Sequence, residues 1–454
     1  MDQNIYRSIP SVDNLLSDSR LNSLSESIDR QFLVDIIREI TDEARNQIQK
    51  NPKVFGQDQL IESIINRVKY ETSSWPLSVI NATGVILHTN MGRAPLSNEA
   101  LEAAKNASID YSDLEVNRKT GKRGSRYSVI ANVLNRLTGS QDAIVVNNNA
   151  AAMLLGLAAI AKGKEVIVSR GEASEIGGGF RIPDVLVQSG AKLIEVGTVN
   201  RTYAEDYEKA ITPKTAAILL VHRSNFQVVG FTHEPRLHDI VQVGKSNGIP
   251  VLHDLGSGAL LDTIPYGLGH EPMPQESIEE GLDLVFFSGD KLLGGPQSGI
   301  IIGNDALVAK LKSHPLARAI RPEKMTLAAL HQTLLHYIKG EALLKIPVWK
   351  MISMPLQHLD TRARKIVQEI GQRAIVVDGF STVGGGSLPT DLMPSKLISL
   401  APTGKWKTET MITKLRDNDP SVIARIENDC LVFDLRTVEP QKDIEITNAI
   451  RSLI

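Results

Sequence analysis

The sequence has a single cysteine, Cys430, among its 454 residues. One thiol cannot form an internal disulfide, and it rules out every metal site built from several cysteines. So little cysteine fits a reducing compartment such as the cytosol. No metal site is expected.

The chain also lacks an excess of either charge and any long apolar run. Its 50 basic and 52 acidic side chains give a formal net charge of −2, so no global field draws it to nucleic acid or to a membrane. No apolar run approaches the thickness of a bilayer, and the first residues lack the regions of a signal peptide. With 42% hydrophobic residues, we expect a globular cytoplasmic protein with a large core.

The glycine motifs that bind nucleotides are missing as well. Neither Gly-x-x-x-x-Gly-Lys-Ser/Thr nor Gly-x-Gly-x-x-Gly occurs, so mononucleotide and dinucleotide binding lose their best support. We find no internal repeat and no low-complexity segment.

The apolar pattern predicts three regions. Residues 1–75 have helical periodicity, most clearly in the runs Ile28–Ile40 and Leu60–Val68. Residues 76–324 alternate strand-like and helical runs, as in an α/β layer architecture. Long helices followed by strand-like pieces predict a smaller α+β domain over residues 325–454.

Short apolar runs mark the expected strands. Seven runs in the middle region predict one large sheet: Ala143–Val146, Glu165–Ser169, Lys192–Val196, Ala216–Val221, Pro250–His253, Leu284–Ser288 and Gly299–Ile302. The pieces expected in the last region are Ile375–Val377, Lys396–Leu400, Val422–Ile426 and Cys430–Leu435.

One lysine, Lys291, ends an apolar run in a small glycine-rich turn. It lies between Asp290 and the pair Gly294-Gly295, after a run apolar enough to be buried. A buried amine can form a Schiff base with a carbonyl compound. The alternative is a loop lysine that only ends a strand, and this segment alone does not decide between the two.

A possible phosphate seat precedes an alanine- and leucine-rich helix. The segment Ile144–Gly156 is a strand, an asparagine turn and a run of strong helix formers. The N–H groups at such a helix start can bind a phosphate, and Asn147, Asn148 and Asn149 can cap the helix or contact the anion. Ordinary capping is the alternative.

A carboxylate, Asp254, completes a possible cofactor site. It ends an apolar strand before a Gly-Ser-Gly turn, and ligands of open α/β sheets bind beyond the carboxyl ends of strands. Pyridoxal phosphate needs an amine, a carboxylate for its ring nitrogen and donors for its phosphate. The ordered set of asparagine turn, Asp254 and Lys291 therefore favours this cofactor, while His253 fits a packing residue.

With these residues identified, the chain resembles the bacterial selenocysteine synthase family, the L-seryl-tRNA(Sec) selenium transferases, over nearly its whole length. The resemblance implies a fold-type-I pyridoxal phosphate enzyme, like aspartate aminotransferase, with Lys291 as the cofactor lysine. It implies conversion of seryl-tRNA(Sec) to selenocysteinyl-tRNA(Sec) with selenophosphate as donor. The matching segments are Ile80–Pro95, Ser169–Arg181, Ile9–Asp13 and the blocks around Asn148, Asp254 and Lys291.

The chemistry requires a base and an anion site. Lys291 is the natural base for the Cα proton, and loss of the β-hydroxyl leaves a dehydroalanyl group to which selenium adds. The phosphate of the donor needs cations with geometry suited to an oxyanion. By resemblance, the anion site comprises Arg93, Asn225, Asp290, Arg318 and Arg321. The alternative for the last two is an i, i+3 pair on a solvated helix.

Two more residues are candidates for cofactor contacts. Glu172 is placed over the cofactor ring or beside the substrate, with a structural carboxylate as the alternative. Ser288, three residues before Lys291, is a candidate phosphate ligand, with strand-end capping as the alternative.

A tRNA partner should leave a trace in the charge pattern. Residues 1–75, to which the family assigns tRNA(Sec) binding, have nine basic and twelve acidic side chains, so recognition there must rest on shape. Residues 118–126 have five cations on a loop that could face tRNA, a subunit neighbour or only solvent. The resemblance also implies a homodecamer of dimers, in which some arginines could act on a neighbouring subunit's cofactor.

Three other functions fit the sequence less well than the selenium transfer that the resemblance implies. A related pyridoxal phosphate lyase for a small amino acid or amino sugar acid would not need the N-terminal extension. A cysteine desulfurase would need a mobile thiol, whereas Cys430 lies in a strand-like run that fits a buried residue. A non-catalytic RNA-binding scaffold would not need Lys291 and Asp254.

Overall fold

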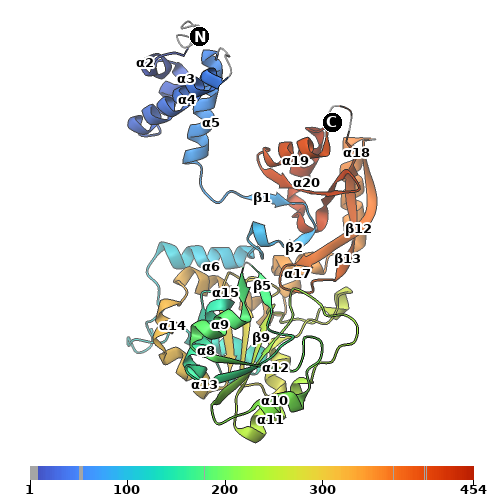
Figure 1. Cartoon of the computed structure of the whole chain (residues 1–454). Helices are drawn as coiled ribbons and strands as arrows, with labels where there is room; N and C mark the ends of the chain where they lie inside the picture. The colour runs from blue at the N-terminus through green and yellow to red at the C-terminus, as the bar shows by residue number, and fades with distance from the viewer. Residues whose placement is uncertain (1–8, 51–54, 178, 372, 403, 405) are drawn as a thin grey trace. The chain divides into compact units, whose positions relative to one another are not determined.

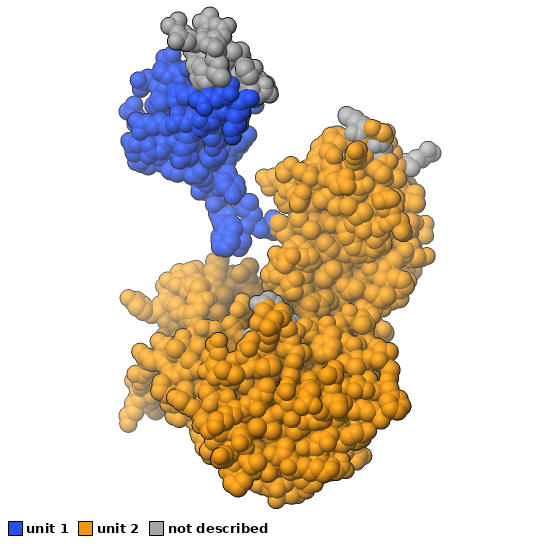
Figure 2. Space-filling view, viewed as in Figure 1, with its two compact units in different colours: residues 1–78 blue, residues 79–454 orange. Residues whose placement is uncertain are grey.

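The computed structural model divides the chain into two compact units, residues 1–78 and 79–454 (Figure 2). Each unit is considered by itself. The structure describes residues 9–50, 55–177, 179–371, 373–402, 404 and 406–454. No helix among these residues is long and apolar enough to cross a membrane.

The first unit is helical, as its periodicity predicted. Its apolar stripes meet in one core that includes Leu33, Ile37, Leu60 and Ile64. Ser11 and Asp18 cap the first two helices by accepting hydrogen bonds from backbone N–H groups. The helices are α2 (Val12–Leu16), α3 (Ser19–Leu24), α4 (Arg30–Lys50) and α5 (Gln57–Thr72).

A seven-stranded mixed sheet is the centre of the second unit (Figure 1). The seven predicted strands are all present in it, and the α/β fold class is confirmed. Only β11 runs antiparallel to its neighbours. In sheet order the strands are β3 (Asp142–Val146), β11 (Gly299–Gly303), β10 (Leu284–Ser288), β9 (Val251–Gly256), β8 (Thr215–Val221), β4 (Glu165–Ser169) and β7 (Lys192–Val196).

Helices cover both faces of this sheet, which is why its strands read as continuous apolar runs. Along β3, Ile144 and Val146 point into one core and Ala143 and Val145 into the other. The helices of the first core are α8 (Asn149–Ala161), α9 (Ile182–Ser189) and α13 (Asp305–Ser313). Those of the second are α7 (Ser128–Thr138), α10 (Ala204–Ala210), α11 (Leu237–Asn247) and α12 (Pro274–Glu280).

The C-terminal part has long helices followed by strands, as the sequence predicted, but the predicted strand Val422–Ile426 is two strands of different sheets, β14 (Ser421–Ile423) and β15 (Arg425–Glu427). A five-stranded sheet of order β15-β16-β13-β12-β2 packs against α18. Its strands are β15 (Arg425–Glu427), β16 (Cys430–Asp434), β13 (Leu392–Leu400), β12 (Ala374–Gly384) and β2 (Val85–Leu87). The short strand β1 (Val79–Asn81) pairs with β14 (Ser421–Ile423), so residues 79–87 join strands far along the chain.

The remaining elements connect these layers, and α6 packs on α15. The helices are α6 (Asn98–Ile109), α14 (Pro315–Ala319), α15 (Lys324–Ile338), α16 (Ala342–Lys345), α17 (Pro347–Ile352), α18 (Leu356–Ile370), α19 (Thr408–Arg416) and α20 (Asp443–Arg451). A two-stranded hairpin is formed by β5 (Glu175–Gly177) and β6 (Phe180–Arg181). Short 3-10 turns are η1 (Thr89–Met91), η2 (Ile264–Tyr266), η3 (Leu435–Thr437) and η4 (Pro440–Lys442).

Candidate active site

A crevice of about 650 Å³ opens beyond the carboxyl ends of β8, β9 and β10. It brings together eight residues that the sequence singled out, although they are spread over some two hundred positions of the chain. These eight are Arg93, Asn148, Asn149, Asn225, Asp254, Ser288, Asp290 and Lys291.

Lys291 lines this crevice and is 6% exposed. Beyond β10 the chain turns tightly, with Gly289 N–H donating to the Ser298 carbonyl at 2.8 Å. A Cβ on Gly289 would lie 2.1 Å from Ser298 Oγ, so the turn requires glycine there. Burial lowers the pKa of Lys291, against the opposing charge of Asp254, and so favours the neutral amine that acts as a nucleophile or base.

Asp254 is almost fully buried near the end of β9. Asn149 donates a hydrogen bond from Nδ2 to Asp254 Oδ1 at 2.7 Å. Burial raises the pKa of Asp254, while this hydrogen bond and the charge of Lys291 act in the opposite direction. A buried carboxylate in this position is stabilised by a cationic ligand group such as a protonated ring nitrogen.

The asparagine turn begins α8 as the sequence predicted. Asn148 is the N-cap, and its side chain accepts from Ala151 N–H at 2.8 Å. Asn149 and Ala150, in the first turn of α8, line the crevice. Asn149 Oδ1 is buried and has no hydrogen-bond partner among the described residues, so the site keeps a polar atom for a ligand.

Arg93 and Asp290 form an ion pair at the crevice wall. Arg93 Nη1 lies 2.9 Å from Asp290 Oδ2, and Ala94 N–H donates to the Asp290 carbonyl at 3.3 Å. Arg93 has a φ of 61°, a left-handed conformation that non-glycine residues rarely adopt. Asn225 also reaches the crevice, with its Nδ2 donating to the Glu175 carbonyl at 3.1 Å.

Four of the predicted residues do not line the crevice of their own chain. Asn147 is exposed, and its backbone N–H donates to the Ile320 carbonyl at 2.9 Å. Glu172 accepts from Val221 N–H at 3.0 Å and lines a neighbouring cavity of about 460 Å³. Arg318 and Arg321 are both exposed, on α14 and just beyond it.

Nine residues line the crevice that sequence reasoning had not selected: Thr89, Asn90, Ala150, His222, Ser224, Gly256, Gln297, Gly385 and Gly386. His222 directly follows β8, and Asp254 lies near the end of β9, so the place of His222 at a strand end was a usable signal. Gly386 gives no local signal, because it reaches Lys291 from the C-terminal part of the chain.

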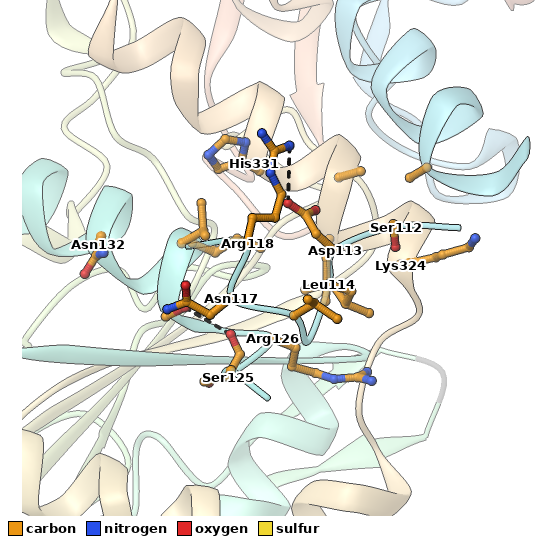
Figure 3. Close-up of a pocket in the computed structure, with 18 of the residues that line it drawn as sticks. Ser112, Asp113, Leu114, Asn117, Arg118, Ser125, Arg126, Asn132, Lys324 and His331 are labelled. Atoms are coloured by element: carbon orange, nitrogen blue, oxygen red, sulfur yellow. Dashed lines mark hydrogen bonds and ion pairs between the residues drawn. The ribbon is translucent and has the colours of Figure 1, made fainter. Parts of the chain in front are cut away.

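The cationic loop 118–126 borders a separate cavity of about 1110 Å³ (Figure 3). Glu115 binds both Arg123, at 2.8 Å, and Arg126, at 2.6 Å. Arg118 forms an ion pair with Asp113, drawn as a dashed line in Figure 3, and the two side chains lie 3.8 Å apart. Three of the five cations therefore have acidic partners within the loop region.

The crevice fits pyridoxal phosphate by its donor set. It holds one buried amine, one buried carboxyl and the first turn of α8, whose backbone N–H groups are hydrogen-bond donors, all within a single crevice. These are the amine, the ring-nitrogen partner and the phosphate donors that this cofactor uses.

Family comparisons agree with this chemistry. A family model described as L-seryl-tRNA selenium transferase matches residues 79–439, and one described as selenocysteine synthase N terminal matches residues 6–45. The L-seryl-tRNA(Sec) selenium transferase of Carboxydothermus hydrogenoformans is 45% identical over 448 residues, covering 96% of this chain and 95% of that protein. That of Alkaliphilus metalliredigens is 44% identical over 461 residues, covering 99% and 98%.

Among solved structures, D-glucosaminate-6-phosphate ammonia-lyase has the same fold. It superposes with a TM-score of 0.59 at 20% sequence identity, covering 85% of this chain and 97% of the lyase. At this identity the likeness concerns the fold alone.

Proposed function

The chain belongs to the L-seryl-tRNA selenium transferase family, and we propose that it converts L-seryl-tRNA(Sec) to L-selenocysteinyl-tRNA(Sec). Its cofactor is pyridoxal 5′-phosphate. The observation that carries the proposal is the buried Lys291 facing Asp254 and the start of α8, in a chain that matches transferases over nearly its whole length. The relatives' names favour transfer over the lyase reaction.

The bound cofactor supplies an electron sink that makes the seryl Cα–H acidic and lets the β-hydroxyl leave. Lys291 Nζ holds the cofactor and then takes up the Cα proton. Asp254 keeps the ring nitrogen protonated. Asn148, Asn149 and Ser288 bind the phosphate together with the N–H groups at the start of α8, which complement its negative charge. Asn147 and Glu172 support this site from outside the crevice.

The selenium donor is selenophosphate, and its phosphate group is held by guanidinium groups. Arg93, oriented by Asp290, and Asn225 serve this role from within the crevice. Arg318 and Arg321 serve it in a neighbouring subunit, a role supported by their exposure on their own chain. Their action in trans requires an oligomer, and we propose dimers assembled into a homodecamer.

The tRNA binds to residues 1–75, and the cationic loop 118–126 contributes phosphate contacts. The match of residues 6–45 to the selenocysteine synthase N terminal supports the first assignment. Exposed Lys119 and Lys122, which have no ion-pair partner among the described residues, support the second. The single cysteine supports a cytoplasmic location.

Replacing Lys291 with Ala tests the proposed function. The variant should lose the visible absorption band of the lysine-bound cofactor and all conversion of seryl-tRNA(Sec), because no other lysine lines the described crevice. Exposed Lys310 on α13, changed to Ala, is the matched control and should keep both. Selenocysteine formation by the Lys291→Ala protein would refute the assignment.

A further inference from the structure

His222 stands in the wall between two cavities. It lines both the crevice that contains Lys291 and the neighbouring cavity of about 460 Å³. Its backbone N–H donates to the Asp254 carbonyl at 2.8 Å, which ties it to the end of β9. His222 therefore borders the crevice on one side and the second cavity on the other.

A buried carboxylate lies behind this imidazole. Glu271, between η2 and α12, is 1% exposed, and its Oε1 lies 3.4 Å from His222 Nε2. That oxygen has no hydrogen-bond partner among the described residues. Burying a carboxylate costs free energy unless a proton donor or cation faces it, and His222 is the group in ion-pair range. Glu271 thus orients the ring and stabilises a positive charge on it.

We propose that His222, oriented by Glu271, donates the proton with which the seryl hydroxyl leaves as water. The inference rests on the proposed function. The Cβ–O bond breaks with its electron pair going to oxygen, which takes the proton from the imidazolium. The Cα–H proton goes to the Lys291 amine, and the electrons of that bond form the Cα=Cβ double bond. The neutral imidazole regains a proton from solvent through the second cavity, and the Lys291 ammonium releases its proton to solvent, so the net products are the dehydroalanyl group and water.

The other ionisable groups around His222 are committed to different contacts. Burial lowers the pKa of His253 to about 3, and its Nδ1 lies 3.0 Å from Ser277 Oγ. Arg223 forms an ion pair with Glu234. Glu172 is held by Val221 N–H, and Asp254 and Lys291 belong to the cofactor site. The other charged or titratable residues that line the two cavities also have partners: His270 lies 3.2 Å from Glu276, Asp391 accepts from Gly269 N–H, and Arg93 pairs with Asp290.

A change of leaving group tests the proton donor. Full-length protein loaded with cofactor would be given tRNA(Sec) carrying either serine or β-chloroalanine, because chloride leaves without a proton whereas hydroxide needs one. His222→Gln should slow single-turnover elimination from the seryl substrate by about 10²- to 10⁴-fold, the usual contribution of a general acid. It should leave elimination of chloride, and the visible cofactor band, unchanged.

Glu271→Gln supplies a second, independent variant. It should slow the seryl reaction by about 10- to 100-fold, as expected when a group that orients an imidazole is removed, and should likewise spare chloride elimination. The matched control is the exposed pair His238 and Glu280, whose Nδ1 and Oε2 lie 3.5 Å apart. Changing either control residue to Gln should alter neither reaction.

Either of two results with the variants would overturn the proposal. Equal losses with both substrates would mean that His222 and Glu271 only support the fold, and a lost cofactor band in His222→Gln would make His222 a cofactor ligand. A parent protein that shows the cofactor band but leaves seryl-tRNA(Sec) unchanged would instead overturn the proposed function, and the proton donor with it.

Discussion

At the residue scale, Lys291 packs against Gly386, which has no side chain. A Cβ on Gly386 would lie 2.6 Å from Lys291 Nζ, and Gly386 has a φ of +87°. We expect Gly386→Ala to push the amine from its place and to reduce the occupancy of the visible cofactor band, because the added methyl group occupies the space of the amine. Titration with pyridoxal phosphate would measure the loss.

The control for this change is Gly340→Ala. Gly340 has a similar φ of +68°, but nothing lies within 4 Å of the added Cβ. Gly340→Ala should lower the free energy of unfolding by about 1 kcal/mol through backbone strain, and it should bind the cofactor as the parent protein does. Equal cofactor binding by both variants would mean that the contact between Gly386 and Lys291 is unimportant.

The raised pKa of Glu172 makes the stability of the folded chain depend on pH. Burial raises its pKa from 4.5 to about 8, so between these values the folded chain retains a proton that the unfolded chain has released. The stabilisation is therefore complete below pH 4.5 and is lost as the pH rises through about 8, at a slope of at most about 1.4 kcal/mol per pH unit. Glu172→Gln keeps the acceptor for Val221 N–H and should flatten this slope.

Thermal unfolding of the cofactor-free protein across this pH range measures the effect. The melting temperature of Glu172→Gln should exceed that of the parent increasingly toward pH 8, and the two should agree near pH 4.5. Exposed Glu208 on α10, changed to Gln, is the control. A difference that stays constant with pH would contradict the prediction.

The site residues that could be predicted share one property: each lies next to an end of a strand-forming or helix-forming run. Lys291 and Asp254 follow apolar runs, and Asn148 precedes a helix-forming run, so the strand or helix itself indicates their position. The contact of Gly386 with Lys291 could not be predicted, because it depends on how the C-terminal part packs on the large sheet. Arg318 and Arg321 came only from the family resemblance.

At the scale of elements, a buried polar network joins the strands of the C-terminal sheet. Asp434, at the end of β16, is fully buried and accepts from Ser381 Oγ of β12 at 2.7 Å and Ser395 Oγ of β13 at 2.8 Å. Asp434→Ala would leave these hydroxyls and Arg436 N–H without an acceptor. We expect a loss of about 3–5 kcal/mol in the free energy of unfolding, measured with urea.

A surface ion pair on the same strands provides the comparison. Asp378 of β12 lies 2.5 Å from Lys396 of β13, but its side chain is 83% exposed. Asp378→Ala should cost less than about 1 kcal/mol, because water screens and replaces an exposed ion pair. If both variants lost a similar amount of unfolding free energy, the burial of Asp434 would not determine how much Asp434 contributes to stability.

The strands of the large sheet were predictable because burial on both faces makes each an unbroken apolar run. Their order was not, since β3 and β11 pair across more than a hundred residues through contacts that leave no local pattern. The strand β12 is longer than the predicted Ile375–Val377, reaching Gly384. Its second half alternates buried and partly exposed side chains, so it contains no continuous apolar run to mark a strand.

At the scale of the whole molecule, the crevice and every residue that lines it belong to the unit 79–454. That unit has its own cores on both faces of the large sheet and in the C-terminal part. The helical unit 1–78 has a separate core. The chemistry and the tRNA binding proposed for residues 1–75 are therefore assigned to parts that can be separated by shortening the chain, while the loop 118–126 stays with the catalytic unit.

We expect a chain shortened to residues 79–454 to keep the visible cofactor band and to lose most of its affinity for tRNA(Sec). Residues 1–75 carry a net charge of −3, so their binding must rest on shape and few phosphate contacts, and the affinity lost should depend weakly on salt. Changing Lys119 and Lys122 to Ala in the full-length chain should do the opposite, with a small loss that disappears as salt is raised. Filter binding at several salt concentrations distinguishes the two, and a shortened chain that binds tRNA(Sec) as tightly as the full one would move recognition into the catalytic unit.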